Sequence, residues 1–399
     1  MNDDNQIGQR LREIRSWRGL RIRTVAELSG LSFSYLAKIE RGEKPVNSRK
    51  TLEALARSLQ VSPVELTGKP YAPTDPVANE AHAGVPAIED VVSGWRLGEV
   101  PETPARPWPE IEMDLKRLNT TLRPNSDYAA QATLLPGLIR DLLVSSAQDE
   151  YRGRALRGLL DAYYAAASVG TRLGFLGLPT LAVERMCQAA EELDDPAWHG
   201  FVAWARAHVL SGTNRDRQYR LAVAAADIKD TRVEARGMAN LTAALAAAAQ
   251  GDEGTSQEHL AEAANLAELI DADVSPWSGN INMHFGRTNV RIWQVAIGVE
   301  LGHGAKVEET AKKVRPETIT ASRQAGFWID YGRGLLAERK TRDRGLEALL
   351  TAEKLAPQQL HHNAFVREAV SGLLTSARRD AGGRELRGLA FRMGVAPTG

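Results

Sequence analysis

The spacing of apolar residues predicts short helices in the first 66 residues. Ile7, Leu11 and Ile14 recur at helical intervals and form the stripe of a first helix. Leu36 and Ile39 are the expected buried pair of a third helix. Two further apolar sets give the second helix an inner face and the fourth helix a repeat: Val25, Ala26 and Leu28, then Leu52, Leu55, Ala56 and Leu59. With a short fifth helix, these elements can just close one core.

Turn and cap residues separate these helices. Gly30 stands where the turn between the second and third helices needs a residue that tolerates a positive φ. Ser32 is a good N-cap for the third helix, because its hydroxyl can accept a hydrogen bond from a first-turn N–H group. Asn47 or Ser48 caps the fourth helix, and Ser62 precedes a proline that opens the fifth.

From about residue 110 to the end, helical stripes alternate with short breaks, and we find no strand pattern. Paired helices are expected at residues 152–168 with 179–193, 197–211 with 216–228, 232–249 with 255–270, 284–302 with 305–314, and 321–340 with 343–356, followed by a last helix near 363–379. Helix pairs that repeat every ~34–50 residues predict an α-solenoid. The predicted fold class is therefore all-α.

One helix pair shows a repeat signature. Gly345, Leu349, Ala352 and Pro357 place small, large, small and proline residues where a tetratricopeptide repeat has them. An earlier pair echoes this spacing with Gly251, Ser256, Leu260 and Ala263. The match indicates a tetratricopeptide-like solenoid, and the number of repeats is left open.

The segment between the two helical regions has a different composition. Residues 68–109 hold eight of the 18 prolines, and proline at this density favours extended chain. Ile88, Val91, Val92 and Trp95 nevertheless recur at helical spacing, which predicts an amphipathic helix at about 86–96. We therefore expect three parts: a small helical domain at 1–67, a proline-rich linker at 68–109, and a larger helical domain at 110–399.

Charge is unevenly distributed along a chain that is neutral as a whole. Residues 1–66 contain 12 Lys and Arg against 8 Asp and Glu, a difference of +4, so the remainder carries −4. A basic first part suits phosphate binding. The single cysteine, Cys187, allows no internal disulfide, which fits a reducing cytoplasm; we expect a buried inert thiol, with a redox role as the alternative.

Leu20 to Leu66 resembles a helix-turn-helix module of the lambda-repressor/Cro (XRE) type. The most specific matches are AELSGLS, which spans the turn, and IERGEK, which follows the third helix. The resemblance implies a largely buried ion pair between Arg15 and Glu40. Arg21 and Ile22 depart from the family, which usually places Ser or Thr followed by Gln there, so the second helix lacks a cap and a polar DNA contact.

The resemblance makes Ser32 to Arg41 the recognition helix, inserted into the major groove. Lys38 could then read guanine, Ser34 is permissive, and Phe33 could contact a thymine methyl group. Tyr35 could contact a base or a phosphate, or Phe33 and Tyr35 could simply pack. Phosphate or positioning contacts are expected from Arg23, Thr24, Ser32, Arg41, Lys44, Asn47, Ser48, Arg49 and Lys50.

An XRE-type head before a tetratricopeptide-like body resembles the peptide-sensing regulators of Gram-positive bacteria and similar regulators of high-GC bacteria. The resemblance implies a homodimer on a near-palindromic operator and a peptide on the concave solenoid surface. Candidate ligand-binding residues are Arg236 and Asn240, Asn289 and Trp293, and Asp330. Hydrogen bonding between repeats, or solvent exposure, is the alternative interpretation of these side chains.

Other functions find little support in the sequence. The histidines show no metal-ligand spacing, and neither a phosphate-binding glycine loop nor a nucleophile–base pattern is present. We expect no enzyme, metal or cofactor, and a cytoplasmic protein without a signal peptide. The favoured hypothesis is a ligand-sensing transcriptional regulator. The alternatives are a scaffold whose solenoid binds a partner protein while the helix-turn-helix localises it on DNA, and a solenoid used only for dimerisation.

Overall fold

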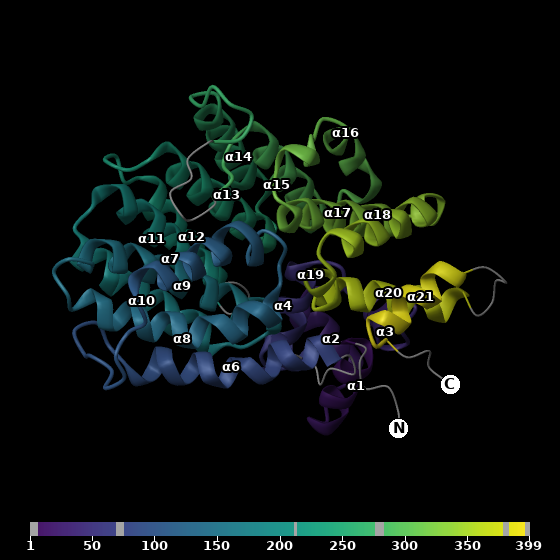
Figure 1. Cartoon of the computed structure of the whole chain (residues 1–399). Coiled ribbons are helices and arrows are strands. Elements are labelled where there is room, and N and C mark those ends of the chain that lie inside the picture. The colour runs from purple at the N-terminus through teal and green to yellow at the C-terminus, as the bar shows by residue number, and fades with distance from the viewer. Residues whose placement is uncertain (1–6, 69–75, 211–213, 276–282, 378–382, 396–399) are drawn as a thin grey trace.

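The computed structural model describes residues 7–68, 76–210, 214–275, 283–377 and 383–395. All regular elements within these ranges are helices, which confirms the all-α prediction. Figure 1 shows a small N-terminal domain against a much larger body. We call residues 7–68 the head and residues 76–395 the body. None of the described helices is long and apolar enough to cross a membrane.

The head contains the five expected helices. They are α1 (Ile7–Trp17), α2 (Ile22–Ser29), α3 (Phe33–Glu40), α4 (Arg49–Ser58) and α5 (Pro63–Thr67). Leu11, Leu36, Ile39 and Leu55 are fully buried in one core, as the pattern predicts. The prediction for Leu28 was wrong: its side chain is 63% exposed, because Val25 and Ala26 alone supply the inner face of α2.

The predicted caps are confirmed and one alternative is resolved. Gly30 adopts a φ of 67°, where a Cβ would be strained. The Ser32 hydroxyl accepts a hydrogen bond from Tyr35 N, and Ser48, not Asn47, caps α4 by accepting from Thr51 N. Ser62 forms a capping box at α5. Arg21 gives α2 no side-chain cap, as its departure from the family pattern predicts.

Helix α6 (Pro76–Gly94) is longer than the predicted 86–96 helix and begins ten residues earlier. Pro86 lies inside it with its ring exposed, so the proline neither starts nor ends the helix. Ile88 and Val92 are fully buried in the main core of the body, and α6 packs on α8, α9 and α10. Most of the expected linker helix is therefore part of the body. Pro70 and Pro73 lie outside the described residues.

The body continues as a succession of helices that each pack on the next. Their bounds are α7 (Trp108–Arg117), a π-helical turn (Leu118–Leu122), α8 (Tyr128–Ser146), α9 (Arg152–Leu173), α10 (Gly177–Leu193), α11 (Pro196–Val209), α12 (Arg215–Ala226), α13 (Val233–Gln250), α14 (Glu253–Ala267), α15 (Arg287–Glu300), α16 (Glu308–Ala311), α17 (Ala321–Leu336), α18 (Arg342–Leu355), α19 (Pro357–His361), α20 (Ala364–Ala377) and α21 (Arg384–Arg392). Three short 3₁₀ turns lie at Gly304–Val307, Pro316–Thr318 and Arg339–Thr341. The partner expected at 305–314 is reduced to a 3₁₀ turn and α16.

Small residues bring α17 and α18 close together. A Cβ built at Gly345 would lie 2.8 Å from Leu336 Cγ and 3.1 Å from the Gly332 carbonyl oxygen. Leu349 and Ala352 are fully buried on the same helix. The spacing that suggested a repeat thus marks a real close contact between paired helices.

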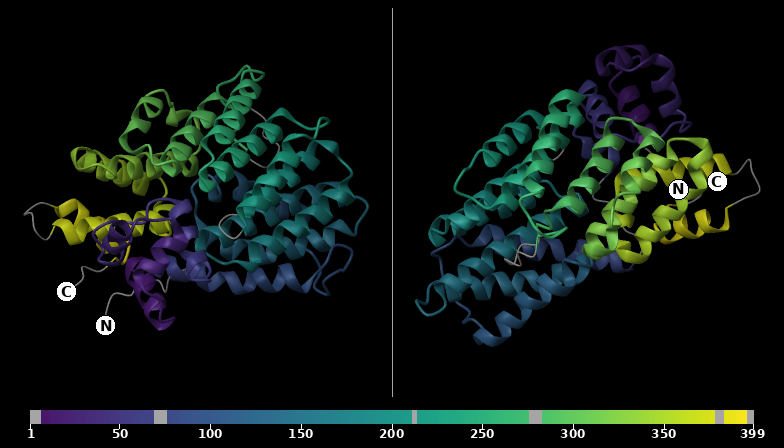
Figure 2. Two further views of the ribbon diagram at one scale, coloured as in Figure 1. Left: turned by 180° about the vertical axis from the view of Figure 1, so that it is seen from behind. Right: turned by 90° about the horizontal axis from the view of Figure 1, so that it is seen from above.

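The two ends of the body meet. Ser126 donates a hydrogen bond to Gln359 Oε1 at 2.7 Å, and Gln358 accepts one from Tyr128 N at 2.9 Å. Gln358 also donates to Asp127. This contact holds α19 against the start of α8, and the C-terminal helices that follow lie beside the head, as the two views in Figure 2 show.

We predict that Ile88→Ala lowers the free energy of unfolding by about 2–5 kcal/mol, because it opens a cavity where α6 meets the body core. Thermal or urea unfolding measures the change. Asp90→Ala, at an exposed position on the same helix, is the control and is expected to have little effect. An Ile88 variant as stable as the wild type would mean that α6 is a dispensable connector.

Candidate nucleic-acid interface and effector site

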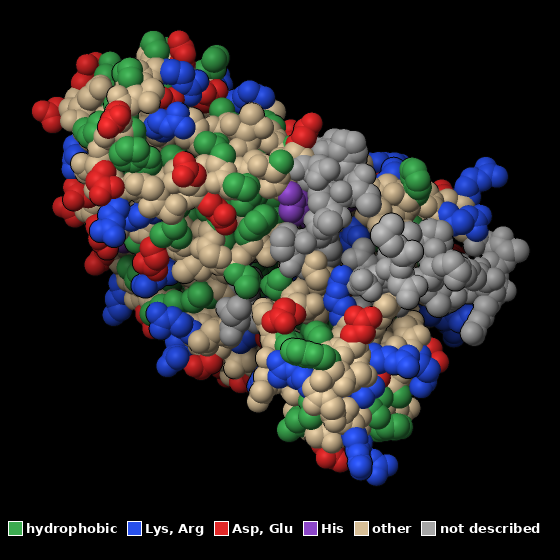
Figure 3. Space-filling view, turned by 90° about the horizontal axis from the view of Figure 1, so that it is seen from below, with side chains coloured by type: hydrophobic (Ala, Val, Ile, Leu, Met, Phe, Trp, Pro, Cys, Tyr) green, Lys and Arg blue, Asp and Glu red, His purple; other side chains and the backbone are tan. Residues whose placement is uncertain are grey.

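The outer face of α3 is open to solvent. Phe33, at the start of the helix, is 50% exposed, and Ser34 and Lys38 are also exposed. Leu36 and Ile39 hold the opposite face in the head core. The residues expected to read bases therefore share one accessible surface. In Figure 3 the head is the lower lobe, where Lys and Arg side chains lie beside exposed hydrophobic ones.

Tyr35 differs from its neighbours, because its ring packs partly against the head core. Burial raises the pKa of its hydroxyl above the usual value. The packing interpretation thus describes Tyr35 better than Phe33, whose ring faces solvent.

The Arg15–Glu40 ion pair forms as the family resemblance implies. Arg15 Nε and Nη2 donate to the two carboxylate oxygens of Glu40 at 2.6 and 3.0 Å. Arg15 Nη1 also donates to the Leu20 carbonyl oxygen. The hydrogen bonds to Glu40 raise the pKa of the Arg15 guanidinium. This bidentate pair ties α1 to the end of α3 and fixes the direction of the recognition helix.

The expected phosphate-binding residues fall into two groups. Arg23 and Lys44 are exposed, Thr24 is half-buried, and Arg41 pairs with Glu43 at 2.7 Å in an exposed contact. An exposed pair of this kind contributes little, so it leaves Arg41 available to a phosphate. The second group, Asn47 to Lys50, lies against the body.

Glu300, at the end of α15, holds the start of α4. Its carboxylate accepts hydrogen bonds from Arg49 N at 2.7 Å and from Arg49 Nη1 at 2.6 Å. Its side chain is 0% exposed. Burial alone would raise the pKa of Glu300, but Arg49, Arg333 and the Arg49 N–H group hold it below the usual value. Glu300 is thus a buried carboxylate at a helix N-terminus, where an anion is stabilised.

Arg333 of α17 completes this contact. Its Nη2 donates to the Asn47 carbonyl oxygen at 2.7 Å and to Glu300 at 3.2 Å, and its Nε donates to Asn47 Oδ1. Asp330 binds Arg333 Nη1 at 2.8 Å. We call Asn47, Arg49, Glu300, Asp330 and Arg333 the clamp. The sequence analysis did not identify Glu300 or Arg333 as contacts of the head. The one available sign was that each is a charged residue in the last turn of a largely apolar helix.

Three further contacts join head and body. Arg215 of α12 pairs with Glu53 of α4 at 2.8 Å. Phe365 of α20 packs on the head core, and the guanidinium carbons of Arg49 and Arg333 lie 5.8 and 4.4 Å from the centre of its ring. Glu368, also on α20, accepts a hydrogen bond from Ile7 N at 3.1 Å.

A comparison with family models identifies the head. Residues 6–67 match the helix-turn-helix domain. The match covers the five helices described above and does not extend into the body. Curated proteins and solved structures give no match to the chain. A helix-turn-helix domain of this kind points to a DNA-binding regulator.

The candidate ligand-binding residues do not form one group. Arg236 donates to the Ala226 carbonyl oxygen, and Asn240 bonds to its own helix and to His259. These contacts correspond to the alternative interpretation, hydrogen bonding between helices. Asp330 belongs to the clamp on the helix-turn-helix head.

Asn289 and Trp293 lie together on α15. Arg323 of α17 donates to Asn289 Oδ1 at 2.7 Å, and its guanidinium carbon lies 5.3 Å from the centre of the Trp293 ring. Trp293 is only 6% exposed, yet its Nε1 has no hydrogen-bond partner among the described residues. We call Asn289, Trp293 and Arg323 the interior cluster. Sequence reasoning missed Arg323.

The surroundings of the interior cluster disfavour positive charge. Burial lowers the pKa of Arg323 to about 10. Burial, together with Arg172 and Arg323, lowers the pKa of His208 to about 3. Burial, with Arg323 and Arg123, lowers the pKa of His284 to about 4. All three shifts have the sign that a neighbouring anion would reverse.

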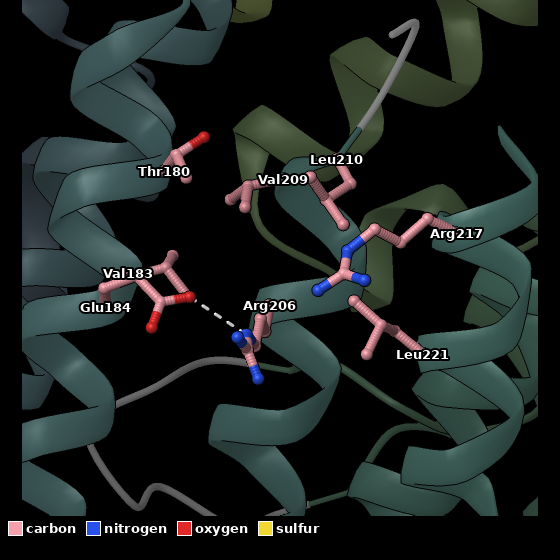
Figure 4. A pocket seen from close by; sticks show the side chains of 8 residues that line it. All are labelled: Thr180, Val183, Glu184, Arg206, Val209, Leu210, Arg217 and Leu221. Atoms are coloured by element: carbon pink, nitrogen blue, oxygen red, sulfur yellow. Dashed lines mark hydrogen bonds and ion pairs between the residues drawn. The ribbon is translucent and has the colours of Figure 1, made fainter. Parts of the chain in front are cut away.

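A separate cavity of about 100 Å³ lies between α10, α11 and α12 (Figure 4). Thr180, Val183, Val209 and Leu221 are among its lining residues, and Arg206 already pairs with Glu184 across its edge. Ligand pockets usually measure about 300–1,000 Å³. This cavity is too small for a peptide and contains none of the candidate residues.

Cys187 and the histidines show no reactive arrangement in the described part of the chain. Burial raises the pKa of the Cys187 thiol to about 11, which favours the inert interpretation. No group of three His, Cys, Asp or Glu side chains within the described ranges could hold a metal ion.

The contact between Glu368 of the body and Ile7 N of the head is expected to depend on pH. Burial raises its pKa from 4.5 to about 7, although the N–H groups of Ile7 and Val46 and the charge of Arg10 act in the opposite direction. A raised carboxyl pKa means that docking is stabilised below pH 4.5 and loses this contribution as the pH rises through about 7. We predict that the wild type loses thermal stability relative to Glu368→Gln between those values.

Unfolding temperatures measured across this pH range test the prediction. Glu13→Gln, an exposed change on α1, serves as the control and should follow the wild type. Parallel curves for the wild type and Glu368→Gln would contradict it.

Proposed function

We propose that this protein is a sequence-specific DNA-binding transcriptional regulator. The observation that carries the proposal is the helix-turn-helix domain, whose α3 presents Phe33, Ser34 and Lys38 outward on a buried scaffold. Lys38 suits a guanine edge, and Phe33 suits a thymine methyl group. Arg23, Thr24, Ser32, Arg41 and Lys44 are available for phosphate or positioning contacts on the undocked part of the head.

We further propose that the body is a tetratricopeptide-like solenoid that senses an effector, a short signalling peptide. The packing of paired helices on their successors supports this, as does the interior cluster. Asn289 and Arg323 offer amide and guanidinium groups, and Trp293 offers an N–H group that has no hydrogen-bond partner among the described residues. A peptide carboxylate would reverse the unfavourable electrostatics described above.

The clamp supports control of the head by the body. The body residues that contact the head include Arg215, Glu300, Arg333, Phe365 and Glu368. Two of them, Glu300 and Arg333, lie on the same helices as the interior cluster. We propose a homodimer that binds two half-sites about one helical turn (~34 Å) apart, so the operator is near-palindromic.

Binding-site selection tests the function. The purified full-length protein is mixed with sheared DNA from its source, with and without extract of conditioned medium, and bound fragments are sequenced. A palindromic motif whose occupancy changes with extract supports a ligand-sensing regulator. Salt-sensitive binding without a motif, together with a protein partner that copurifies with the body, would favour the scaffold hypothesis.

We predict that Lys38→Ala weakens binding to the selected site by about 1–3 kcal/mol, because one base contact is lost. Fluorescence anisotropy with the selected duplex and a random duplex measures the difference. Lys44→Ala is the control for a phosphate contact and should weaken both complexes equally. An equal loss on both duplexes for Lys38→Ala would reassign this residue to phosphate binding.

A further inference from the structure

Two groups of head residues are expected to contact DNA, and only one of these groups is exposed to solvent. The base-reading side chains Phe33, Ser34 and Lys38 are exposed. The residues expected to grip the adjacent phosphates, Asn47 and Arg49, are engaged by the body. Lys50 also lies at the body, since its Nζ would be 2.2 Å from a Cβ built on Gly251.

The group that engages Arg49 shares two features with a DNA phosphate, a negative charge and two acceptor oxygens. One Glu300 oxygen accepts a hydrogen bond from Arg49 N in the first turn of α4, and the other accepts one from the Arg49 guanidinium. A DNA phosphate bound by this helix start would use the same two donors. Two anions cannot occupy one donor pair, so docking and this phosphate contact exclude each other.

We propose that Glu300 occupies the position of a DNA phosphate at the N-terminus of α4, so that the docked head is autoinhibited and binds DNA fully only after the clamp opens. This inference rests on the proposed function and adds the device by which the body restrains the head. It identifies the body surface formed by Glu300, Arg333 and Phe365 as a competitor of DNA.

The polar character of the interface makes it suitable for release. Arg215 with Glu53, Glu300 with Arg49, and Glu368 with Ile7 N provide charged or polar contacts, whereas Phe365 is the apolar contact on the head core. Interfaces of this composition resemble those of transient complexes. Removal of one charge leaves its partner buried and unpaired, which weakens the docked state more than the released state.

Arg215→Ala gives the sharpest test, because Arg215 lies on the body and its contacts are with Glu53 and Gln218, not with the base-reading face. Glu300→Gln is the second variant. Affinity of the full-length proteins for a fluorescent mixed-sequence duplex is measured at low salt, where phosphate contacts dominate. Both variants are expected to bind about tenfold more tightly, since apparent affinity follows the released fraction.

Arg152→Ala is the matched control, because it breaks an exposed Arg–Glu pair on the body far from the clamp in sequence. It should bind the duplex as the wild type does. Hydrogen exchange provides the second readout. Addition of DNA to the wild type should increase exchange in α20, which carries Phe365 and Glu368, because the head leaves it.

The outcomes separate the two proposals. Equal affinity of all four proteins, or an α20 that stays protected in the DNA complex, would overturn the autoinhibition while leaving DNA binding intact. Absence of duplex binding in every variant, including those with an opened clamp, would overturn the proposed function itself.

Discussion

The arrangement of this molecule depends on one buried carboxylate. Glu300 lies between Arg49 and Arg333 with no exposed surface, and such burial is tolerated only because both oxygens are occupied by charged or N–H donors. The pair spans 251 residues of sequence and connects two separately formed cores. Because Glu300 is desolvated, the contact is tolerated only while all its partners are present. Removal of one partner leaves a buried, unpaired charge, which is strongly unfavourable. A junction with this property favours two discrete states over gradual loosening.

Closure of the body on itself provides the support that this junction requires. Ser126 and Tyr128, near the start of the body, bond to Gln359 and Gln358 near its end. Helix α19, which lies between the helices that carry Arg333 and Phe365 in the chain, is therefore held against the start of α8. The interior cluster lies on α15 and α17, and the clamp residues Glu300 and Arg333 lie on the same two helices. A change in the distance between α15 and α17 would therefore alter the interior cluster and the clamp at the same time.

Local signals made the head predictable. Gly30, Ser32 and the Arg15–Glu40 pair follow from steric rules, hydrogen-bonding rules and a specific resemblance, and each is present. Leu28 was misplaced because apolar spacing alone cannot distinguish a core position from the next one around a short helix. Helix α6 was expected only at about 86–96, where apolar residues recur at helical spacing from Ile88 to Trp95. The buried residues Ala81 and Val85 show that the same apolar face begins earlier. Glu300 and Arg333 could not be predicted, because their partners are set by the tertiary fold.

The early anchoring of α6 has a consequence for how the head competes for DNA. The last described head residue is Gly68, and α6 begins at Pro76, whose helix is fixed in the body core. Whatever path the intervening chain takes, bond geometry limits this span to roughly 25–30 Å. The head therefore cannot move farther than this from the start of α6, so the body surface stays close to the head in every molecule. Under the proposed autoinhibition, DNA competes with a surface of the same molecule. The fraction of molecules with a released head would then not depend on the protein concentration.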